Sequence, residues 1–319
     1  MRAMILAAGL GTRMAPLSDA RPKPALPILD EPMILHMVRQ LASLGMESVV
    51  VNTHAHPDLL ARALEPAPIP VHLSHEPELL GSAGGIRAAR RHLEDGGPFL
   101  VMNADMRIEL ELASLLEAHA GATALATLLL RDDPRHQSFG SIGYDRAQRV
   151  CRVTDRLTLG AESGCGLFTG VQVMSPEILA HIPDRPVSQL MSDVYVPGLE
   201  RGATLVCVLQ DPRRAWWPVG SPAELLESNL RALHSLASDA RVHPDARVDG
   251  ALHPPVWIGA RARVPADATL GPHVVVGADT WIPPGLEAHH CLFLPGARPL
   301  PQAPLAHAVA FDQEVWRRA

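Results

Sequence analysis

Apolar and polar positions follow two alternating periods along the first 130 residues. Short apolar runs that end at glycine or polar residues are typical of buried strands, and they cover residues 3–8, 48–53, 70–74, 99–103 and 122–130. Helical periodicity separates these runs at residues 32–44, 58–64, 82–93 and 110–120. Strands that alternate with helices predict an α/β fold with a Rossmann-like, mostly parallel sheet that is covered on both faces.

Parallel sheets of this kind bind ligands beyond the carboxyl ends of their strands. Three stretches follow predicted strands in this way, namely residues 9–13, 81–85 and 103–105. We therefore expect these stretches to share one rim of the sheet, whatever chemistry they perform.

The pattern changes between residues 140 and 220, where predicted strands at 141–144, 149–154, 167–174 and 204–209 have short connections. This region is expected to form a lid over the rim. A helix over residues 221–236 follows, with Ser221 as its N-cap, Pro222 at its first position and Glu224 three residues after the cap. This helix closes a first domain of residues 1–237.

A six-residue repeat characterises the second domain, residues 238–319. Branched aliphatic anchors recur every six residues, at Ile258, Val264, Leu270, Val276 and Ile282. This period is the signature of a β-helix, so we predict a short left-handed parallel β-helix of about two coils. The stretch AVAFDQEVW near the end of the chain predicts a strand that caps it.

Composition narrows the ligand classes and the location. The formal net charge of −6 over 319 residues excludes a general attraction to nucleic acid or to an anionic membrane. Four cysteines without CxxC or zinc-site spacing favour free thiols in a reducing compartment, so we expect a cytoplasmic protein. An apolar run of the roughly 18 residues that a membrane span needs is missing from the sequence.

The strongest chemical signal is the segment GLGTRMAPLSDARPKPALP at residues 9–27. Gly9 and Gly11 allow a close backbone approach to phosphate oxygens, and Arg13 offers a bidentate fork. Lys23 lies between two prolines and is the only lysine among 28 basic residues, which indicates a specific need for an ammonium group.

Two other interpretations of this segment remain. The first is an ordinary strand–loop turn with solvated basic residues, because a bare GxG is a weak motif. A dinucleotide-binding loop is the second, but it needs a third glycine where Met14 stands and an immediate helix, which the following prolines prevent.

The segment resembles the N-terminal signature of the sugar-1-phosphate nucleotidyltransferases (nucleoside-diphosphate-sugar pyrophosphorylases). Further segments resemble this family in the same order, with a frequent hexapeptide-repeat companion behind them: EPELLGSAGGI (76–86), MNADM (102–106), SFGSIGYD (138–145), VTDRL (153–157), FTGVQVMSPEIL (168–179) and WWPVGSPAELLESNL (216–230). The resemblance covers roughly residues 1–295.

The resemblance implies transfer of a nucleoside monophosphate from a nucleoside triphosphate to a sugar 1-phosphate, with Mg²⁺ as the cofactor. Arg13 and Lys23 would be catalytic, and Asp105 would bind the metal. The nucleotide-binding residues would be Leu6, Ala7, Ala8, Gly9, Gly11, Thr12 and Gly84, and the sugar-binding residues Gly140, Asp155, Arg156 and Thr169.

Two departures from the family pattern affect this assignment. Asp155-Arg156 replaces Glu-Lys, which keeps both charges but alters reach. Pro218 stands where the family carries a second metal-binding aspartate, and Asp211 and Glu224 are the nearest carboxylates along the chain. A non-catalytic relative that binds a nucleotide sugar and regulates a partner enzyme is therefore the alternative function.

The substrate stays open at the level of sequence. Residues 168–179 are similar to uridylyltransferases for N-acetylmuramate 1-phosphate, while the hexad tail is similar to mannose-1-phosphate guanylyltransferases, and we favour mannose 1-phosphate with GTP. A cytidylyltransferase for phosphocholine is a third alternative, which the hexad domain disfavours. We expect a homo-oligomer formed through the hexapeptide domain.

Other candidate residues carry weaker signals. His54 and His56 are expected to be loop residues rather than a metal pair. His289-His290 is expected to be a solvated turn rather than an acyl-transfer site. Trp216 and Trp217 are expected to pack the lid.

Overall fold

The computed structural model describes residues 1–135, 141–236, 239–301 and 304–318. The chain divides into two compact units. The first unit comprises residues 1–10 and 34–216, and the second comprises residues 11–33 and 217–319. The second unit therefore contains the segment of Arg13 and Lys23 as well as the six-residue repeat.

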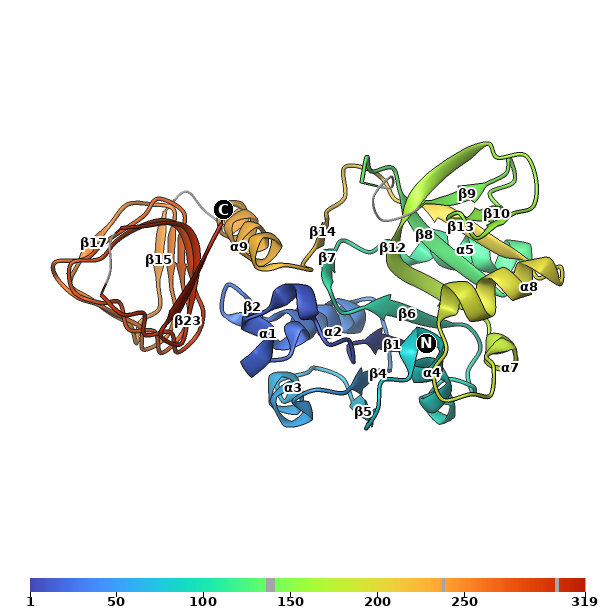
Figure 1. Ribbon diagram of the computed structural model, residues 1–319, viewed down its shortest axis with the longest axis horizontal. Coiled ribbons are helices and arrows are strands. Elements are labelled where there is room, and N and C mark those ends of the chain that lie inside the picture. The colour runs from blue at the N-terminus through green and yellow to red at the C-terminus, as the bar shows by residue number, and fades with distance from the viewer. Residues whose placement is uncertain (136–140, 237–238, 302–303, 319) are drawn as a thin grey trace. The chain divides into compact units, whose positions relative to one another are not determined.

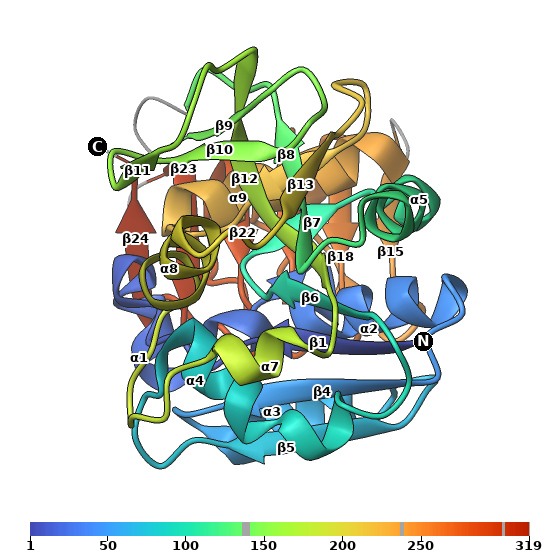
Figure 2. The ribbon, with the colours of Figure 1, turned by 90° about the vertical axis from the view of Figure 1, so that its right-hand side faces the viewer.

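A parallel sheet forms the centre of the first unit. Its strands β1 (Arg2–Leu6), β4 (Ser48–Thr53), β5 (Val71–His75) and β6 (Phe99–Asn103) lie in the order β6-β1-β4-β5, as Figure 2 shows. All four run in one direction, so their carboxyl ends share one edge, as the sequence predicts for these strands.

Helices cover both faces of this sheet. Figure 1 shows α2 (Met33–Ser43) and α3 (Pro57–Leu64) on one side of β1 and β4, and α4 (Gly81–Ala88) and α7 (Ile178–His181) on the other. Met4, Val50 and Val101 alternate with residues of the opposite face and pack against Ala83 and Ile86 of α4 in one buried cluster. Continuous apolar strands fit this environment because both of their faces are buried.

Antiparallel strands extend the sheet beyond β6. The long strand β12 (Gly164–Met174) pairs antiparallel with both β6 and β8 (Ala126–Arg131), and β13 (Leu205–Leu209) pairs parallel with β8. The predicted strands β9 (Ile142–Tyr144) and β10 (Val150–Val153) continue the same sheet through β12, and β11 (Leu157–Thr158), which the sequence did not predict, pairs with β10. Further described elements of this unit are a 3-10 turn (Arg90–His92), β7 (Met106–Ile108), α5 (Leu112–Ala122), a π-helical turn (Leu190–Tyr195) and α8 (Val196–Glu200).

The second unit contains several short N-terminal elements and one long helix. Its N-terminal segment forms 3-10 turns at Thr12–Met14 and Lys23–Ala25, α1 (Leu17–Ala20), β2 (Pro27–Ile28) and β3 (Glu31–Pro32). The strand β14 (Trp216–Pro218) precedes α9 (Pro222–Leu236). The buried Asn229 of α9 accepts a hydrogen bond from Leu29 N at 2.6 Å and donates one to Pro27 O at 3.1 Å. These bonds hold the proline-rich segment against α9.

The predicted N-cap of α9 is confirmed. Glu224 N donates to Ser221 Oγ at 3.3 Å, and Ser221 Oγ lies 3.3 Å from Glu224 Oε2. The same Glu224 carboxylate accepts a hydrogen bond of 2.7 Å from Gly220 N. This arrangement satisfies backbone groups that the first turn of a helix leaves unpaired.

Parallel strands stack along the six-residue repeat. One stack runs through β15 (Ala240–Val242), β18 (Val256–Ile258), β21 (Val274–Val276), β22 (Glu287–Phe293) and β23 (Leu305–Phe311). A second stack joins β17 (Ala251–Leu252), β20 (Thr269–Leu270) and β22, while β16 (Arg247–Val248) pairs with β19 (Arg263–Val264). Figure 1 shows the coiled path of the chain in this region, with β15, β17 and β23 labelled on it.

The five predicted anchors are all buried, since Ile258, Val264, Leu270, Val276 and Ile282 are at most 2% exposed. The expectation of about two coils is wrong, because five strands lie in the first stack. The later strand β22 is seven residues long and lacks the hexad pattern, which hid it in the sequence. The single strand predicted over residues 308–316 is divided by a turn at Asp312 and Gln313 into the end of β23 and the start of β24 (Glu314–Arg317), which pair antiparallel.

Among the described residues, the helices are too short or too polar to cross a membrane.

Candidate active site

A buried polar pair organises the rim of the first unit. Asn52 is the second-last residue of β4, and its Oδ1 accepts a hydrogen bond of 2.6 Å from Ala7 N, directly after β1. Asn52 Nδ2 donates to Glu76 Oε1 at 2.7 Å, and Glu76 Oε2 accepts from Leu80 N at 3.0 Å. Both side chains are buried. The pair therefore fixes the backbone that leaves β1 relative to the segment that enters α4.

The glycines of α4 are required by packing within this unit. A Cβ on Gly85 would lie 2.6 Å from Glu76 Oε1 and 2.8 Å from Asn52 Nδ2. A Cβ on Gly84, the predicted nucleotide contact, would lie 2.9 Å from Leu80 Cβ. These glycines let α4 approach the Asn52–Glu76 pair closely.

The predicted metal ligand Asp105 lies in the turn after β6. Leu6 and Asn103 are register partners at the ends of β1 and β6, and Ala104 N donates to Leu6 O at 3.0 Å. Asp105 follows this bond and is partly buried. The structure thus brings Leu6 and the Asp105 turn together, as the common rim predicts.

Thr169 and Gly170 form an irregularity in β12 beside this turn. Gly170 has φ +90°, and a Cβ there would lie 2.8 Å from Asn103 Nδ2. The Thr169 hydroxyl donates to Leu129 O at 2.9 Å, and its side chain is only 3% exposed. Thr169 O accepts a hydrogen bond of 3.1 Å from Trp216 Nε1. The Trp216 indole is buried and packs against β12.

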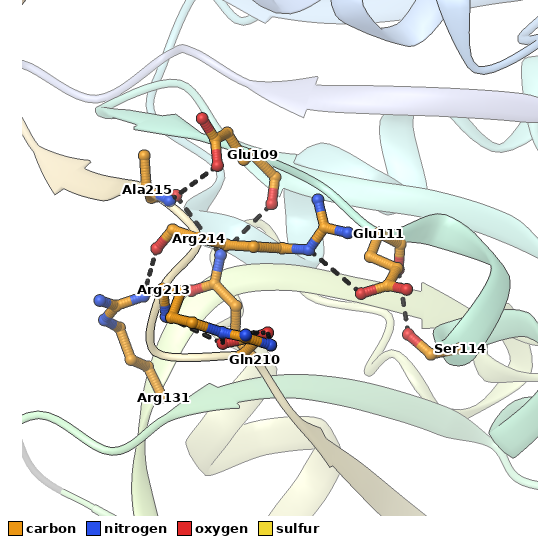
Figure 3. A network of polar contacts seen from close by, with 9 residues as sticks. Glu109, Glu111, Ser114, Arg131, Gln210, Arg213, Arg214 and Ala215 are labelled. Carbon is orange, nitrogen blue, oxygen red and sulfur yellow. Dashed lines mark hydrogen bonds and ion pairs between the residues drawn. The ribbon is translucent and has the colours of Figure 1, made fainter.

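A polar network holds the turn that precedes Trp216, and Figure 3 shows its members. Arg131 Nη1 donates to Gln210 Oε1 and to Arg214 O, both at 2.9 Å. Ala215 N donates to Glu109 Oε2 at 3.0 Å, and Glu109 N donates to Ala215 O at 2.9 Å. An ion pair of 3.2 Å joins Arg214 to Glu111. This network ties residues 210–215 to the segment that follows the Asp105 turn.

The predicted phosphate-binding segment lies in the second unit. Gly11 has φ +65°, and Met14 N closes the turn by donating to Gly11 O at 2.7 Å. A Cβ on Gly11 would lie 3.3 Å from Lys23 Cβ, so the stem of Lys23 packs against the glycine. Thr12 and Arg13 are exposed. The structure therefore brings Gly11 and Lys23 together, although twelve positions separate them in the sequence.

Gly9 differs from Gly11 in its surroundings. A Cβ on Gly9 would meet none of the described atoms within 4 Å, and this residue is exposed. Gly9 therefore leaves open space at the point where the chain passes from β1 to the Gly11 turn. Packing within the described residues does not explain a glycine here, whereas close approach of a ligand would.

Arg13 lies against the loop that carries Pro218. A Cβ on Gly220 would lie 3.2 Å from Arg13 Nη2. The two carboxylates nearest to Pro218 in the sequence have other roles. Glu224 caps α9, and Asp211 is paired with Arg213 in an exposed turn, where hydrogen bonds from Arg213 lower its pKa to about 2.

The sugar-binding predictions lie on the extended sheet, except Gly140, which falls outside the described residues. Asp155 and Arg156 are exposed in the turn between β10 and β11. Arg152 stabilises this turn through a bidentate pair with Glu162 at 2.6 and 3.0 Å and a bond of 3.1 Å to Thr154 O. The hydrogen bond from Arg152 lowers the pKa of Glu162.

Sequence reasoning missed the residues that position these loops. Asn52 carries a signal, because a polar side chain that ends the apolar run VVVN is unusual within a buried strand. No sequence signal points to Glu76, Arg131 or Gln210. Each of them is hydrogen-bonded to a residue that lies far away along the chain. His54 contacts Glu76 O through Nδ1 at 2.8 Å, which fits the expected loop role.

The profile of the nucleotidyl transferase family matches residues 2–235. The catalytic subunit beta of mannose-1-phosphate guanylyltransferase from Dictyostelium discoideum is 30% identical over 243 residues, which are 75% of this chain and 66% of that protein. Mannose-1-phosphate guanylyltransferase 1 of Arabidopsis thaliana is 26% identical over 307 residues, which are 93% of this chain and 82% of that protein.

A solved structure shares the fold of the first part of the chain. The crystal structure of HddC from Yersinia pseudotuberculosis complexed with GMP-PN aligns with a TM-score of 0.60 at 20% identity, over 72% of this chain and 99% of that chain. This likeness supports a mixed α/β nucleotidyltransferase fold with a parallel sheet. Because the family profile spans most of its length, the chain belongs to the nucleotidyl transferase family.

Proposed function

We propose that the protein transfers a nucleoside monophosphate from a nucleoside triphosphate to a sugar 1-phosphate and releases pyrophosphate, with GTP and mannose 1-phosphate as the favoured pair. The observation that carries this proposal is the packing of the single lysine, Lys23, against the left-handed turn at Gly11. The names of the Dictyostelium and Arabidopsis relatives support the choice of sugar and base.

The reaction is an in-line displacement at the α-phosphorus. A phosphate oxygen of the sugar 1-phosphate forms a new P–O bond, and the bond between the α-phosphorus and the bridging oxygen of pyrophosphate breaks. The protein contributes positioning and charge neutralisation rather than covalent chemistry. Arg13 binds the departing pyrophosphate through its guanidinium fork. Lys23 aligns the reacting phosphates as a point charge.

The nucleotide binds along the backbone that leaves β1. Leu6, Ala7 and Ala8 contact the base and ribose together with Gly84, and Gly9, Gly11 and Thr12 surround the phosphates. Two features support this assignment. Asn52 fixes Ala7 N by a hydrogen bond of 2.6 Å, and Gly9 leaves open space for a ligand. The residues proposed to contact the base and ribose near β1 and those proposed to surround the phosphates follow one another along the chain, from Leu6 to Thr12.

The residues fit a Mg²⁺ ion that is held mainly by substrate. Asp105 offers one carboxylate at the rim, while Pro218 offers no ligand atom in its side chain. Mg²⁺ commonly uses one or two carboxylates together with substrate phosphates and water, so a single aspartate suffices for binding. When bound, the ion would neutralise the negative charge on the phosphates.

The sugar binds to the extended sheet. Asp155 and Arg156 supply a carboxylate and a guanidinium at an exposed turn, and Gly140 belongs to the neighbouring segment. Thr169 acts through the backbone irregularity that it stabilises, since its hydroxyl is bonded to Leu129 O. Arg152 stabilises the turn that carries Asp155 and Arg156, and an ordered turn supports recognition of a small polar ligand.

We also propose a domain boundary near residue 237 and a left-handed β-helix behind it, which assembles the protein into a homo-oligomer. Parallel pairs 18 residues apart, such as Val256 with Val274, support a β-helix with three sides. An apolar groove of about 500 Å³ on this region, with Trp281 53% and Leu300 59% exposed, supports an interface. Four free cysteines support a cytoplasmic location.

The test is a matrix of nucleoside triphosphates against sugar 1-phosphates. Each triphosphate is incubated with Mg²⁺ and mannose, glucose or N-acetylmuramate 1-phosphate, and pyrophosphate release is measured. We expect the highest kcat/KM with GTP and mannose 1-phosphate. Phosphocholine with CTP is included as a separate arm. Binding of nucleotide sugars without pyrophosphate release from any pair would instead favour the regulatory homologue that Pro218 suggests.

A further inference from the structure

Three histidines recur every seventeen residues in the second unit, at His273, His290 and His307. All three have left-handed backbone conformations, with φ values of 62°, 52° and 50°. The strand register explains their alignment, because Val274 pairs with Cys291 and Cys291 pairs with Ala308. Each histidine precedes one of these paired positions, so the three lie above one another on successive strands.

The imidazole rings form a column. The ring centroids of His273 and His290 are 4.6 Å apart, and those of His290 and His307 are 4.9 Å apart. His289 meets this column edge-on, with its centroid 5.5 Å from that of His290 and 6.0 Å from that of His307. His289 Nδ1 lies 3.2 Å from His290 Nδ1.

Nitrogen atoms of three of these histidines converge. One ring nitrogen from each of His289, His290 and His307 lies within 4.8 Å of the others. His289 and His307 are exposed and His290 is half-buried, so an ion can reach the cluster from solvent.

We propose that His289, His290 and His307 bind one divalent transition-metal ion of the Zn²⁺ class. Imidazole nitrogen suits Zn²⁺, Ni²⁺ and Cu²⁺, whereas Mg²⁺ prefers oxygen ligands. Zn–N bonds of about 2.0–2.1 Å bring ligand nitrogens of a tetrahedral site to roughly 3.3 Å from one another. The exposed rings of His289 and His307 reach this spacing by side-chain rotation, and a water molecule takes the fourth position.

The strand register holds the cluster in place, because His289 and His290 lie on β22 and His307 lies on its parallel partner β23. His273 Nδ1, next in the column, is buried and has no hydrogen-bond partner among the described residues. The ion would link β22 to β23 and so brace the last strands of the stack.

The first experiment measures Zn²⁺ binding to the full-length chain by isothermal titration calorimetry at pH 7.5, without Mg²⁺ or nucleotide. We expect one Zn²⁺ per chain. His307→Ala and His289→Asn should each weaken binding at least tenfold, because each removes one of three protein ligands. His253→Asn is the matched control, since His253 is an exposed histidine of the same unit outside the column. Circular dichroism verifies the fold of each variant.

A second measurement identifies the ligands. Electron paramagnetic resonance of the Cu²⁺-loaded chain should show hyperfine coupling to imidazole nitrogen, and His307→Ala should reduce it while His253→Asn leaves it unchanged. The proposal is overturned if the wild-type chain binds no Zn²⁺, or if the column variants and the His253 variant bind it equally well. Neither result depends on catalytic activity, so this test is independent of the proposed reaction.

Discussion

The side-chain amide of Asn52 donates a hydrogen bond of 2.7 Å to Glu76, and both side chains are buried. Replacing Asn52 with alanine removes the acceptor of Ala7 N and the donor to Glu76. Buried polar groups without partners cost about 1–3 kcal/mol each, more when charged. We therefore expect Asn52→Ala to lower the free energy of unfolding by at least about 2 kcal/mol in urea denaturation.

The control for this prediction is Ser43→Ala. Ser43 makes only an exposed hydrogen bond to Gln40 O at 2.7 Å, so its loss should change the free energy of unfolding by no more than about 0.5 kcal/mol. Equal effects of the two substitutions would show that the Asn52–Glu76 pair does not organise the rim.

The two glycines of the phosphate-binding segment should respond differently to alanine. Gly11→Ala places a Cβ at φ +65° and 3.3 Å from Lys23 Cβ, which should destabilise the protein by about 1–2 kcal/mol and displace the lysine. Gly9→Ala enters open space and should leave stability unchanged within about 0.5 kcal/mol. Its effect should fall on KM for the triphosphate, which steady-state kinetics would measure.

The opposite pattern would contradict this account. If Gly9→Ala destabilised the folded chain while KM for the triphosphate stayed constant, the glycine would serve local structure instead of the ligand.

Local patterns were sufficient to predict the parallel strands of the first unit and the hexad anchors of the second. The apolar runs around Met4, Val50 and Val101 can be recognised from a few neighbouring residues. The same holds for the anchors from Ile258 to Ile282. The motif around Lys23 was equally local. Topology then placed the carboxyl ends of the parallel strands on one edge without any knowledge of distant contacts.

Positioning residues could not be predicted in the same way. Arg131 donates hydrogen bonds to Gln210 and Arg214, and Glu76 accepts one from Asn52. These roles depend on pairs of residues that only the folded chain brings together. Thr169 shows the converse problem. Its sequence position suggested a sugar contact, whereas its hydroxyl bonds to Leu129 O. The histidine column was missed because its period of seventeen differs from the hexad period that drew attention.

Acid should destabilise the first unit through His119. The buried His119 lies between Thr127 Oγ1 and Ser175 Oγ, each 2.9 Å from a ring nitrogen. Burial lowers its pKa below the ordinary 6.5, and the charge of Glu177 opposes this only in part. Because the folded pKa is depressed, the stabilisation is present above pH 6.5 and is lost as the pH falls below that value.

The measurement is the free energy of unfolding between pH 7.5 and pH 5. The His119→Gln variant should lose less stability than the wild type over this range, because glutamine does not titrate. His253→Gln, at an exposed position, should follow the wild-type curve. Parallel curves for wild type and His119→Gln would exclude His119 as the source.

The role of Lys23 can be tested by one substitution that removes its charge and another that keeps the charge but changes the geometry of the cationic group. Lys23→Ala should lower kcat at least about a hundredfold, which is the scale for loss of one transition-state contact. Lys23→Arg keeps the charge but replaces a point charge with a planar fork, so we expect an intermediate loss. Arg146→Ala removes a positive charge from an exposed loop and should leave kcat unchanged. A Lys23→Ala variant with near-normal kcat would refute the assignment.

Pro218 offers a gain-of-function test of the metal site. If Asp105 is the only carboxylate ligand, Pro218→Asp should add a second one at the partly exposed strand before α9. We expect the Mg²⁺ concentration for half-maximal activity to fall at least about threefold, which corresponds to roughly 0.6 kcal/mol of extra binding. Loss of proline also relaxes the unfolded chain and should cost about 0.4–1 kcal/mol of stability, so activity is measured well below the unfolding temperature.

Pro218→Asn separates charge from backbone in this experiment. Asparagine also removes the proline ring, but its neutral amide is a weaker ligand for Mg²⁺ than a carboxylate. A fall in the Mg²⁺ requirement with aspartate alone would show that the position faces the metal and that proline limits the affinity. Identical Mg²⁺ dependence in wild type, Pro218→Asp and Pro218→Asn would mean that this position lies outside the metal's reach, and that Asp105 with the substrate phosphates forms the complete site.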